Sequence, residues 1–264
     1  MDIDRPTDLA GVLEALRQAP DATLLAGGTD LMVEINFGHT RPDHIIALRR
    51  VGELQELNGT IGSGVTWARL EQGPFRALAQ AARTVGSPQI RAAGTIGGNV
   101  ATASPAGDGL PYLVALDAEI DLRSARGERR LRWDEFFTGP KMTAIEPGEL
   151  IHSIILPEEL PARQEFGKVG VRNAMVISAV MACVLRFDDG RTRVAVGSAG
   201  PTTLRMSRAE EMISAEADPS EAALAEFQRL VSEEVRPITE HRSTESYRRY
   251  AAGVIARRLL ERCL

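Results

Sequence analysis

The order of the predicted segments indicates an α+β fold, and three observations lead to this class. A strand–loop–helix–strand pattern occupies the N-terminal part, short strand-like segments dominate the middle, and strands followed by helices form the C-terminal part. Runs of strands followed by runs of helices are typical of α+β proteins. We therefore predict three subdomains, with boundaries at residues 1–52, 53–160 and 161–264.

The N-terminal part predicts a small α/β unit. Thr7 can cap a helix over Leu9–Leu16, where apolar residues recur at helical spacing. An apolar strand, Thr23–Ala26, follows and runs directly into a glycine-rich loop. A short helix over Leu31–Asn36 and a second apolar strand over His44–Leu48 complete the unit.

The middle part predicts a larger α+β unit. It begins with a strand over Thr60–Thr66 and a helix over Pro74–Val85. The stretch Gly86–Gly109 is dense in Gly, Ala, Ser and Pro and is expected to be irregular. Three further strands are expected over Ala118–Arg123, Arg130–Trp133 and Leu150–Leu156. Residues Pro157–Pro161 then form a hinge between subdomains.

The C-terminal part predicts a three-stranded sheet and a helical bundle. The strands are expected over Glu165–Val171, Val176–Phe187 and Arg193–Ser198. The helices are expected over Thr203–Ile213, Ser220–Val231 and Ser243–Cys263.

Composition narrows the class of protein. The chain has 264 residues, 44% hydrophobic residues and a net charge of −5, which argues against nucleic acid as a partner. Its two cysteines, Cys183 and Cys263, are too few for an iron–sulfur or zinc site of its own, so no metal ligands are predicted. The longest uncharged apolar run, Ala174–Leu185, is too short to span a bilayer. Because the N-terminus also lacks a signal-peptide pattern, a soluble cytoplasmic protein without membrane insertion is expected.

Several common catalytic motifs are absent from the sequence. There is no P-loop, no HExxH pair and no GxSxG elbow. The segment Gly62-Ser63-Gly64 begins like a dinucleotide fingerprint, but Trp67 stands where the third glycine belongs. No catalytic acid, base or nucleophile is therefore predicted.

Two glycine-rich loops carry the strongest chemical signal. They are Leu24–Leu31, with Gly27 and Gly28, and Gly94–Asn99, with Gly97 and Gly98. Paired glycines let a backbone approach an anion closely with its N–H groups turned inward, which suits a diphosphate. Tight turns use the same residues, so either loop alone is also compatible with a purely structural role.

Asp108, which follows the second loop, has two interpretations. It can be the N-cap of a helix over Leu110–Leu116, or a carboxylate that accepts hydrogen bonds from sugar or ribityl hydroxyls. Composition does not separate them.

Four segments together resemble a known family. "LLAGGTDL", "GTIGGNVATASPAGD", "GPKMTAIEPGELI" and "RSTESYRRYAAGVIARRLL" are similar to the FAD-binding subunits of molybdenum hydroxylases, such as xanthine dehydrogenase and carbon monoxide dehydrogenase. The resemblance covers essentially the whole chain. It implies the FAD-binding fold of the vanillyl-alcohol-oxidase type and an extended FAD.

The resemblance also implies which residues hold the cofactor. The first loop and the second would hold the diphosphate and flank the flavin, with Asp108 near the ribityl chain and Ile151 and Lys168 in contact with FAD. The residues assigned to FAD in this way are Leu24, Leu25, Ala26, Gly27, Gly28, Thr29, Asp30, Leu31, Thr95, Ile96, Gly97, Gly98, Asn99, Asp108, Ile151 and Lys168. Some members place an aromatic residue over the flavin where this chain has Thr84-Val85-Gly86, so its stacking partner is open.

The implied function is electron transfer within a larger assembly. FAD would take electrons from the [2Fe–2S] clusters of a small partner subunit and pass them to NAD⁺, dioxygen or another acceptor. A large molybdopterin subunit would oxidise the substrate, for which a purine or other N-heterocycle is suggested, and the assembly would be a dimer of heterotrimers. Two alternatives stay open: a standalone flavin oxidoreductase of the same fold, and a flavin-free assembly module.

The lysine content adds one argument about the site. Lys141 and Lys168 are the two lysines among 31 basic residues. The family match expects a lysine at position 168, where a compact ammonium differs from a planar guanidinium. Lys141 has no predicted role.

Overall fold

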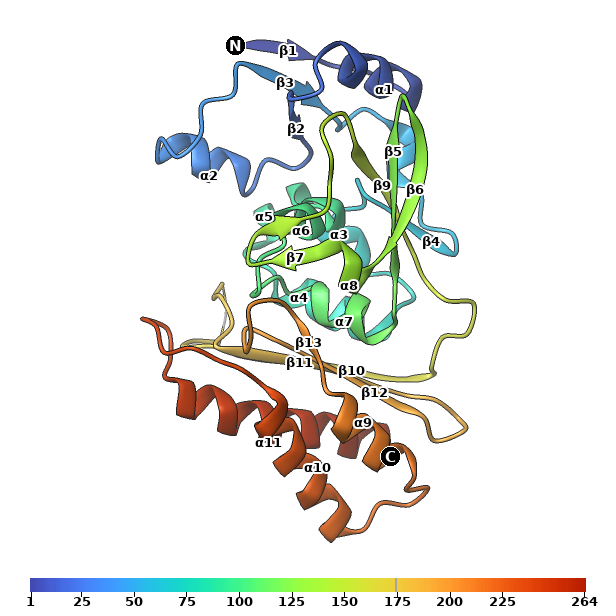
Figure 1. Ribbon diagram of the computed structural model, residues 1–264, viewed down its shortest axis with the longest axis vertical. Coiled ribbons are helices and arrows are strands. Elements are labelled where there is room, and N and C mark those ends of the chain that lie inside the picture. Colours follow the sequence, from blue (N-terminus) through green and yellow to red (C-terminus); the bar gives the residue numbers. More distant parts are fainter. Residues whose placement is uncertain (174) are drawn as a thin grey trace.

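The computed structural model describes residues 1–173 and 175–264, and it has a mixed helix and sheet architecture. Ala174, the first residue of the predicted apolar run Ala174–Leu185, therefore lies outside the described residues. Figure 1 shows a column of three layers along the long axis, with the N-terminal elements at one end and the C-terminal helices at the other. No helix of the described chain is long and apolar enough to cross a membrane.

The N-terminal layer is a three-stranded parallel sheet in the order β1-β3-β2, flanked by helices. The helix α1 is capped by Asp8, whose side chain accepts from the Gly11 N–H at 2.8 Å, so the predicted cap at Thr7 is wrong by one residue. Both residue types cap well, and the first helical residue decides between them. The elements are β1 (Asp2–Asp4), α1 (Leu9–Gln18), β2 (Thr23–Leu25), α2 (Leu31–Asn36) and β3 (His44–Ala47).

The middle layer contains a four-stranded antiparallel sheet in the order β4-β9-β5-β6 beside a group of short helices (Figure 1). Its elements are η1 (Gly52–Gln55), β4 (Thr60–Gly62), α3 (Trp67–Leu70), α4 (Arg76–Thr84), α5 (Pro88–Ala93), α6 (Ile96–Thr102), α7 (Leu110–Ala115), β5 (Glu119–Ser124), β6 (Gly127–Arg132), α8 (Trp133–Phe136), β7 (Phe137–Gly139), β8 (Met142–Thr143) and β9 (Leu150–Ile155).

The stretch predicted to be irregular, Gly86–Gly109, contains two helices instead. Ser87 caps α5 with Pro88 in its first turn, and Thr95 caps α6. These capping signals were present in the sequence. The two helices have only 6 and 7 residues, which is too short for an apolar periodicity to show.

The C-terminal layer is an antiparallel sheet in the order β10-β11-β12-β13 covered by helices. The expected three strands are present, and β13 adds a fourth of two residues at one edge. Part of the predicted helix over Thr203–Ile213 is this strand, and the helix begins only at Ser207. The elements are β10 (Arg163–Val169), β11 (Val180–Arg186), β12 (Thr192–Gly197), β13 (Leu204–Arg205), α9 (Ser207–Ser214), α10 (Glu221–Glu234) and α11 (Glu245–Cys263).

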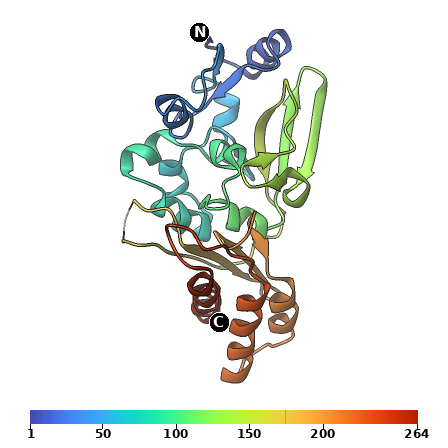
Figure 2. The same cartoon turned by 60° about the vertical axis from the view of Figure 1, so that its left-hand side comes forward.

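Strand β11 joins the middle and C-terminal layers, because all seven of its residues are buried. Met181, Cys183 and Leu185 pack into the core shared with the middle layer. Val180 and Val184 on the other face pack against the helices. Figure 2 shows this sheet between the middle helices and the C-terminal helices. Burial on both faces explains why this segment is a continuous apolar run rather than an alternating one.

Three clusters of buried side chains correspond broadly to the three predicted parts of the chain. The N-terminal cluster gathers around Val12, Leu16 and Ile46, but it also takes Leu150 from β9. The middle cluster reaches into β10, β11 and β12. The division at 1–52, 53–160 and 161–264 therefore stays a prediction, since the cores share residues across these boundaries.

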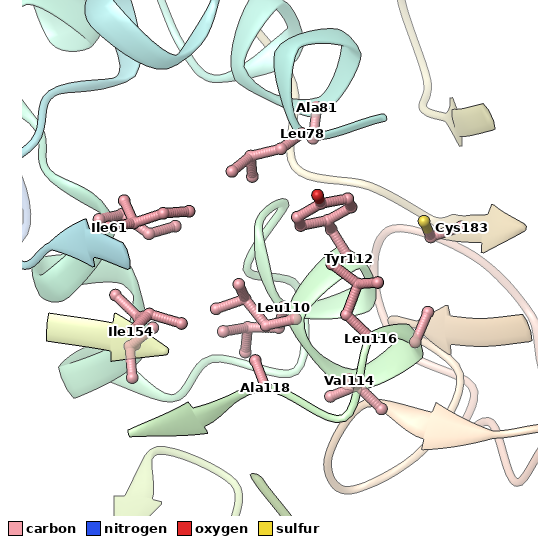
Figure 3. Packing of buried hydrophobic residues seen from close by; sticks show 14 of the residues in the cluster. Ile61, Leu78, Ala81, Leu110, Tyr112, Val114, Leu116, Ala118, Ile154 and Cys183 are labelled. Carbon is pink, nitrogen blue, oxygen red and sulfur yellow. The ribbon is translucent and has the colours of Figure 1, made fainter. Parts of the chain in front are cut away.

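The middle core contains one polar defect that makes a testable prediction. The hydroxyl of Tyr112 is buried without a hydrogen-bond partner among the described residues, and burial raises the pKa of this phenol well above its ordinary value. Figure 3 shows Tyr112 among apolar side chains such as Leu78 and Ala81. Tyr112→Phe is expected to raise the free energy of unfolding by about 1 kcal/mol, because it removes an unsatisfied buried group.

Urea unfolding of the purified chain measures this effect. Tyr112→Leu is the control. It removes the aromatic ring as well as the hydroxyl, and it is expected to destabilise the chain by about 2 kcal/mol or more. A lower stability of Tyr112→Phe would show that the hydroxyl is satisfied in solution.

Candidate functional site

A cavity of about 720 Å³ lies where the N-terminal and middle layers meet, and it reaches the C-terminal layer at Lys168 and residues 175–177. Its walls come from the loop between β2 and α2, the helices α5 and α6, the loop Ser104–Asp108 and Lys168 of β10. Segments distant in sequence therefore converge on one hollow. Its volume is in the range of small-molecule and cofactor sites.

The first glycine loop needs both of its glycines. A Cβ atom on Gly27 would lie 2.6 Å from the carbonyl carbon of Ala93 and 2.9 Å from the Cα of Gly94, closer than real side chains come. Gly28 has a φ of +72°, in the left-handed region that favours glycine. The first loop therefore packs backbone to backbone against the end of α5, immediately before the second loop.

The first loop also presents unused hydrogen-bond donors. None of the backbone N–H groups from Gly27 to Leu31 donates to another described residue. All five of these residues line the cavity. Because backbone N–H groups normally find a partner, a row of free donors at a cavity wall is suited to bind an anion.

The second glycine loop is organised differently, and here the sequence interpretation needs correction. The N–H groups of Ile96 and Gly97 already donate to Val65 O and Ser63 O at 3.0 and 2.9 Å. Those of Gly98 and Asn99 donate to Thr95, which caps α6. The glycines of this loop allow close packing instead, since a Cβ on Gly97 would lie 2.6 Å from Ser63 O. The second loop is therefore a wall of the cavity and not a second cradle of free N–H groups.

A buried ion pair stands at one end of the cavity. Lys168 Nζ lies 2.6 Å from Asp108 Oδ2 and 3.5 Å from the Thr84 carbonyl oxygen, and both charged side chains are at most 8% exposed. Burial raises the pKa of the Asp108 carboxyl, while the Lys168 ammonium opposes this rise. Gly109 is the N-cap of α7, so Asp108 does not cap this helix. Of its two interpretations, the structure excludes the capping role.

Two buried acceptors at the cavity have no partner among the described residues. They are Asp108 Oδ1 and the carboxamide oxygen of Asn99. Both residues line the cavity. Because an unsatisfied buried acceptor is costly, these atoms suit a ligand rich in hydroxyl groups.

Most of the residues predicted from the sequence meet at this cavity. Those that line it are Leu24, Leu25, Ala26, Gly27, Gly28, Thr29, Asp30, Leu31, Thr95, Gly98, Asn99, Asp108 and Lys168. Three others do not line it. Ile96 and Gly97 face inward from α6, and Ile151 of β9 is 6% exposed in the middle core, paired with Leu122 of β5.

Several lining residues are not among those that the sequence assigns to FAD. Val85 and Gly86 line the cavity, in the segment for which the family resemblance leaves the stacking partner open, and Trp67 is the one aromatic residue among the described lining residues. In the sequence, Trp67 only excludes a dinucleotide fingerprint and has no predicted place at a site. Glu34 also lines the cavity, and it accepts hydrogen bonds from His39 and from Lys141, at 3.4 Å. No periodicity or spacing signal pointed to either residue.

Comparison with known families gives the class of the chain. Residues 1–159 match the family described as the FAD binding domain in molybdopterin dehydrogenase, and residues 166–263 match the CO dehydrogenase flavoprotein C-terminal domain. The chain therefore belongs to the FAD-binding subunits of the molybdopterin-dependent dehydrogenases, and FAD is its cofactor.

Individual relatives place it within that class. The chain is 35% identical to the nicotinate dehydrogenase FAD-subunit of Eubacterium barkeri, over 77% of this chain and 75% of the relative. It is 29% identical to the xanthine dehydrogenase FAD-binding subunit of Escherichia coli O157:H7, over 97% and 93%. Its structure is similar to that of quinoline 2-oxidoreductase from Pseudomonas putida 86, with a TM-score of 0.90, 26% identity, and coverage of 100% and 96%.

Proposed function

We propose that FAD lies extended in this cavity, with its diphosphate on the backbone of Gly27–Leu31. The observation that carries the proposal is the row of free N–H groups at a wall where Gly27 and Gly28 cannot be replaced without strain. Backbone donors suit a diphosphate here because Lys168, the one basic side chain among the described lining residues, is already paired with Asp108. FAD, when bound, supplies the capacity to accept and release electrons.

The remaining lining residues would orient the cofactor. Asp108 Oδ1 and the Asn99 carboxamide oxygen are available to accept from ribityl or ribose hydroxyls. The Lys168 ammonium brings a fixed positive charge to the same end of the cavity. Because the Asp108 carboxylate offsets this charge, the pair would favour electron uptake only by a group that lies closer to the ammonium than to the carboxylate.

We further propose that the chain works as the electron-transfer subunit of a larger assembly. Electrons would arrive from the [2Fe–2S] clusters of a small partner subunit, after substrate oxidation on a large molybdopterin subunit, and leave to NAD⁺, dioxygen or another acceptor. The assembly would be a dimer of heterotrimers. Support comes from the relatives, which are named as FAD subunits. Nicotinate, xanthine and quinoline in the names of these relatives are N-heterocycles, which supports a substrate of that class.

A flavin titration and a reduction assay test these proposals. The purified chain should bind FAD and show flavin absorbance, and the bound flavin should be reduced by the substrate only when the partner subunits are present. No flavin binding would favour an assembly module. Reduction by a small substrate without partners would favour a standalone oxidoreductase.

The two lysines are expected to respond differently to substitution by arginine. Lys168→Arg should weaken FAD binding by about tenfold or alter flavin reduction, because a planar guanidinium does not fit between Asp108 and the Thr84 carbonyl as an ammonium does. Lys141 is exposed in the turn between β7 and β8, where arginine can also pair with Glu34. Lys141→Arg should therefore leave both properties unchanged.

Isothermal titration measures the affinity of both lysine variants for FAD, and the reduction assay measures the reduction of their bound flavin. Equal affinities and equal reduction for wild type and Lys168→Arg would show that position 168 has no requirement for lysine.

A further inference from the structure

The loop Ser104–Asp108 forms one wall of the cavity, and an outside segment holds it there. Residues Ser104, Ala106, Gly107 and Asp108 line the cavity. The carbonyl oxygen of Pro105 accepts a hydrogen bond from the N–H of Ser198 at 2.7 Å. Ser198 lies in the turn after β12, in the C-terminal layer, so this wall is tied to a distant part of the chain.

Ser198 has a backbone conformation that needs support. Its φ is +60°, in the left-handed region that residues other than glycine rarely adopt. Such a conformation persists where the surrounding contacts impose it. The hydroxyl of Ser198 is hydrogen-bonded to the Ser178 hydroxyl at 2.9 Å, and its carbonyl oxygen accepts from Arg248 Nη1 at 2.6 Å.

Arg248 is an unusual residue on α11. It is 3% exposed, whereas the next residue, Arg249, is partly exposed and binds the carbonyl oxygens of Ser232 and Val235. Arg248 also pairs with Glu240 through Nη2, and its Nε is buried without a partner among the described residues. A buried guanidinium with one unsatisfied donor is costly for stability alone, which favours a role beyond packing.

We propose that Arg248 is a positioning residue for the FAD site, which acts through the turn at Ser198 on the cavity wall Ser104–Asp108. The guanidinium fixes the Ser198 carbonyl, the Ser198 N–H fixes the Pro105 carbonyl, and the wall then presents Asp108 toward Lys168 and the cavity. This inference deepens the proposed function, since it rests on FAD lying in this cavity.

The experiment compares Arg248→Met with Arg249→Met, a neighbour on the same helix that does not contact the turn. Hydrogen exchange of the flavin-free chain is measured first. Arg248→Met should speed amide exchange at Ser198 and across residues 104–109, while Arg249→Met should leave these amides at the wild-type rate and affect the contact between α10 and α11 instead. This readout does not depend on FAD.

The Kd for FAD is measured second, by titration. The thermal midpoint of each flavin-free variant is measured beside it. Arg248→Met should raise the Kd for FAD about tenfold, as expected if the wall then keeps its binding position in about one tenth of the molecules, whereas Arg249→Met should not change it. If Arg248→Met does not fold, Arg248→Lys keeps the buried charge and should give smaller changes of the same sign.

Unchanged exchange at residues 104–109 together with an unchanged Kd would overturn the proposal. An equal rise in Kd for Arg249→Met would also overturn it, because the effect would then follow general stability. Faster exchange with no FAD binding even by wild type would retain the link from Arg248 to the wall and contradict the proposed cofactor site instead.

Discussion

Replacing Gly27 with alanine is expected to weaken FAD binding by about a hundredfold. The new methyl group would lie 2.6 Å from the Ala93 carbonyl carbon, so the first loop would have to move away from α5 and the second loop. The overlap is with backbone, which cannot turn aside as a flexible side chain can. The row of N–H groups from Gly27 to Leu31 would then lose its alignment. Titration with FAD, monitored through the flavin fluorescence, measures the change in affinity.

Two other glycines calibrate this result. Gly28→Ala introduces a strained φ and a contact of 3.2 Å with the flexible Leu25 side chain, at a cost of about 1 kcal/mol, and should weaken binding by about tenfold or less. Gly52→Ala is the matched control, because a Cβ there meets no atom within 4 Å and the residue lies outside the cavity lining. The thermal midpoint of each flavin-free variant separates loss of the site from loss of the fold. Binding by Gly27→Ala at the level of Gly52→Ala would contradict the backbone cradle.

Lys168→Met is expected to lower the free energy of unfolding by about 3 kcal/mol at neutral pH and to weaken FAD binding. The substitution leaves the Asp108 carboxylate buried at 7% exposure without its cationic partner. Urea unfolding measures the stability. The double variant Asp108→Leu with Lys168→Met should recover most of this stability, because no charge remains buried, and yet should still bind FAD weakly.

The loss of stability in Lys168→Met should depend on pH. Burial already raises the pKa of Asp108, and removing the ammonium that opposes this rise raises it further. The folded variant therefore binds a proton at Asp108 more readily than the unfolded chain does. Its stability relative to wild type should improve as the pH falls from 7 toward the ordinary range of a carboxyl group and worsen as the pH rises. A pH-independent difference between the two proteins would show that Asp108 stays charged in the variant.

Local patterns predicted much of the secondary structure. The helix α2 has the predicted bounds, and α1, α10 and α11 begin within two residues of their expected starts. Apolar periodicity and capping residues act over a few neighbours, so one sequence contains them in full. The sequence does not predict the short helices α5 and α6, because no apolar periodicity accompanies their capping residues.

Residues of the candidate site were predictable where their type is compatible with few structural roles. The family resemblance assigns Gly27, Gly28, Asp108 and Lys168 to FAD. The structure brings them to one cavity, and their contact with FAD stays a prediction. Ile151 was carried over from the same resemblance, but it lies in a core between two sheet strands. An apolar residue at a strand position is compatible with either location, so its type alone does not decide.

The sequence by itself determined the class of the chain and the positions of several of its helices, such as α1, α2, α10 and α11, because these depend on residue types and short spacings. Only the tertiary structure decided how the hydrogen bonding of the backbone N–H groups differs between the two glycine loops. In the first loop the N–H groups of Gly27–Leu31 have no partner among the described residues, whereas those of Ile96–Asn99 in the second donate to Ser63, Val65 and Thr95. It also revealed the path from Arg248 to the cavity wall. Hydrogen-bond partners distant in sequence decide both features, and no local pattern records which partner a backbone group will find.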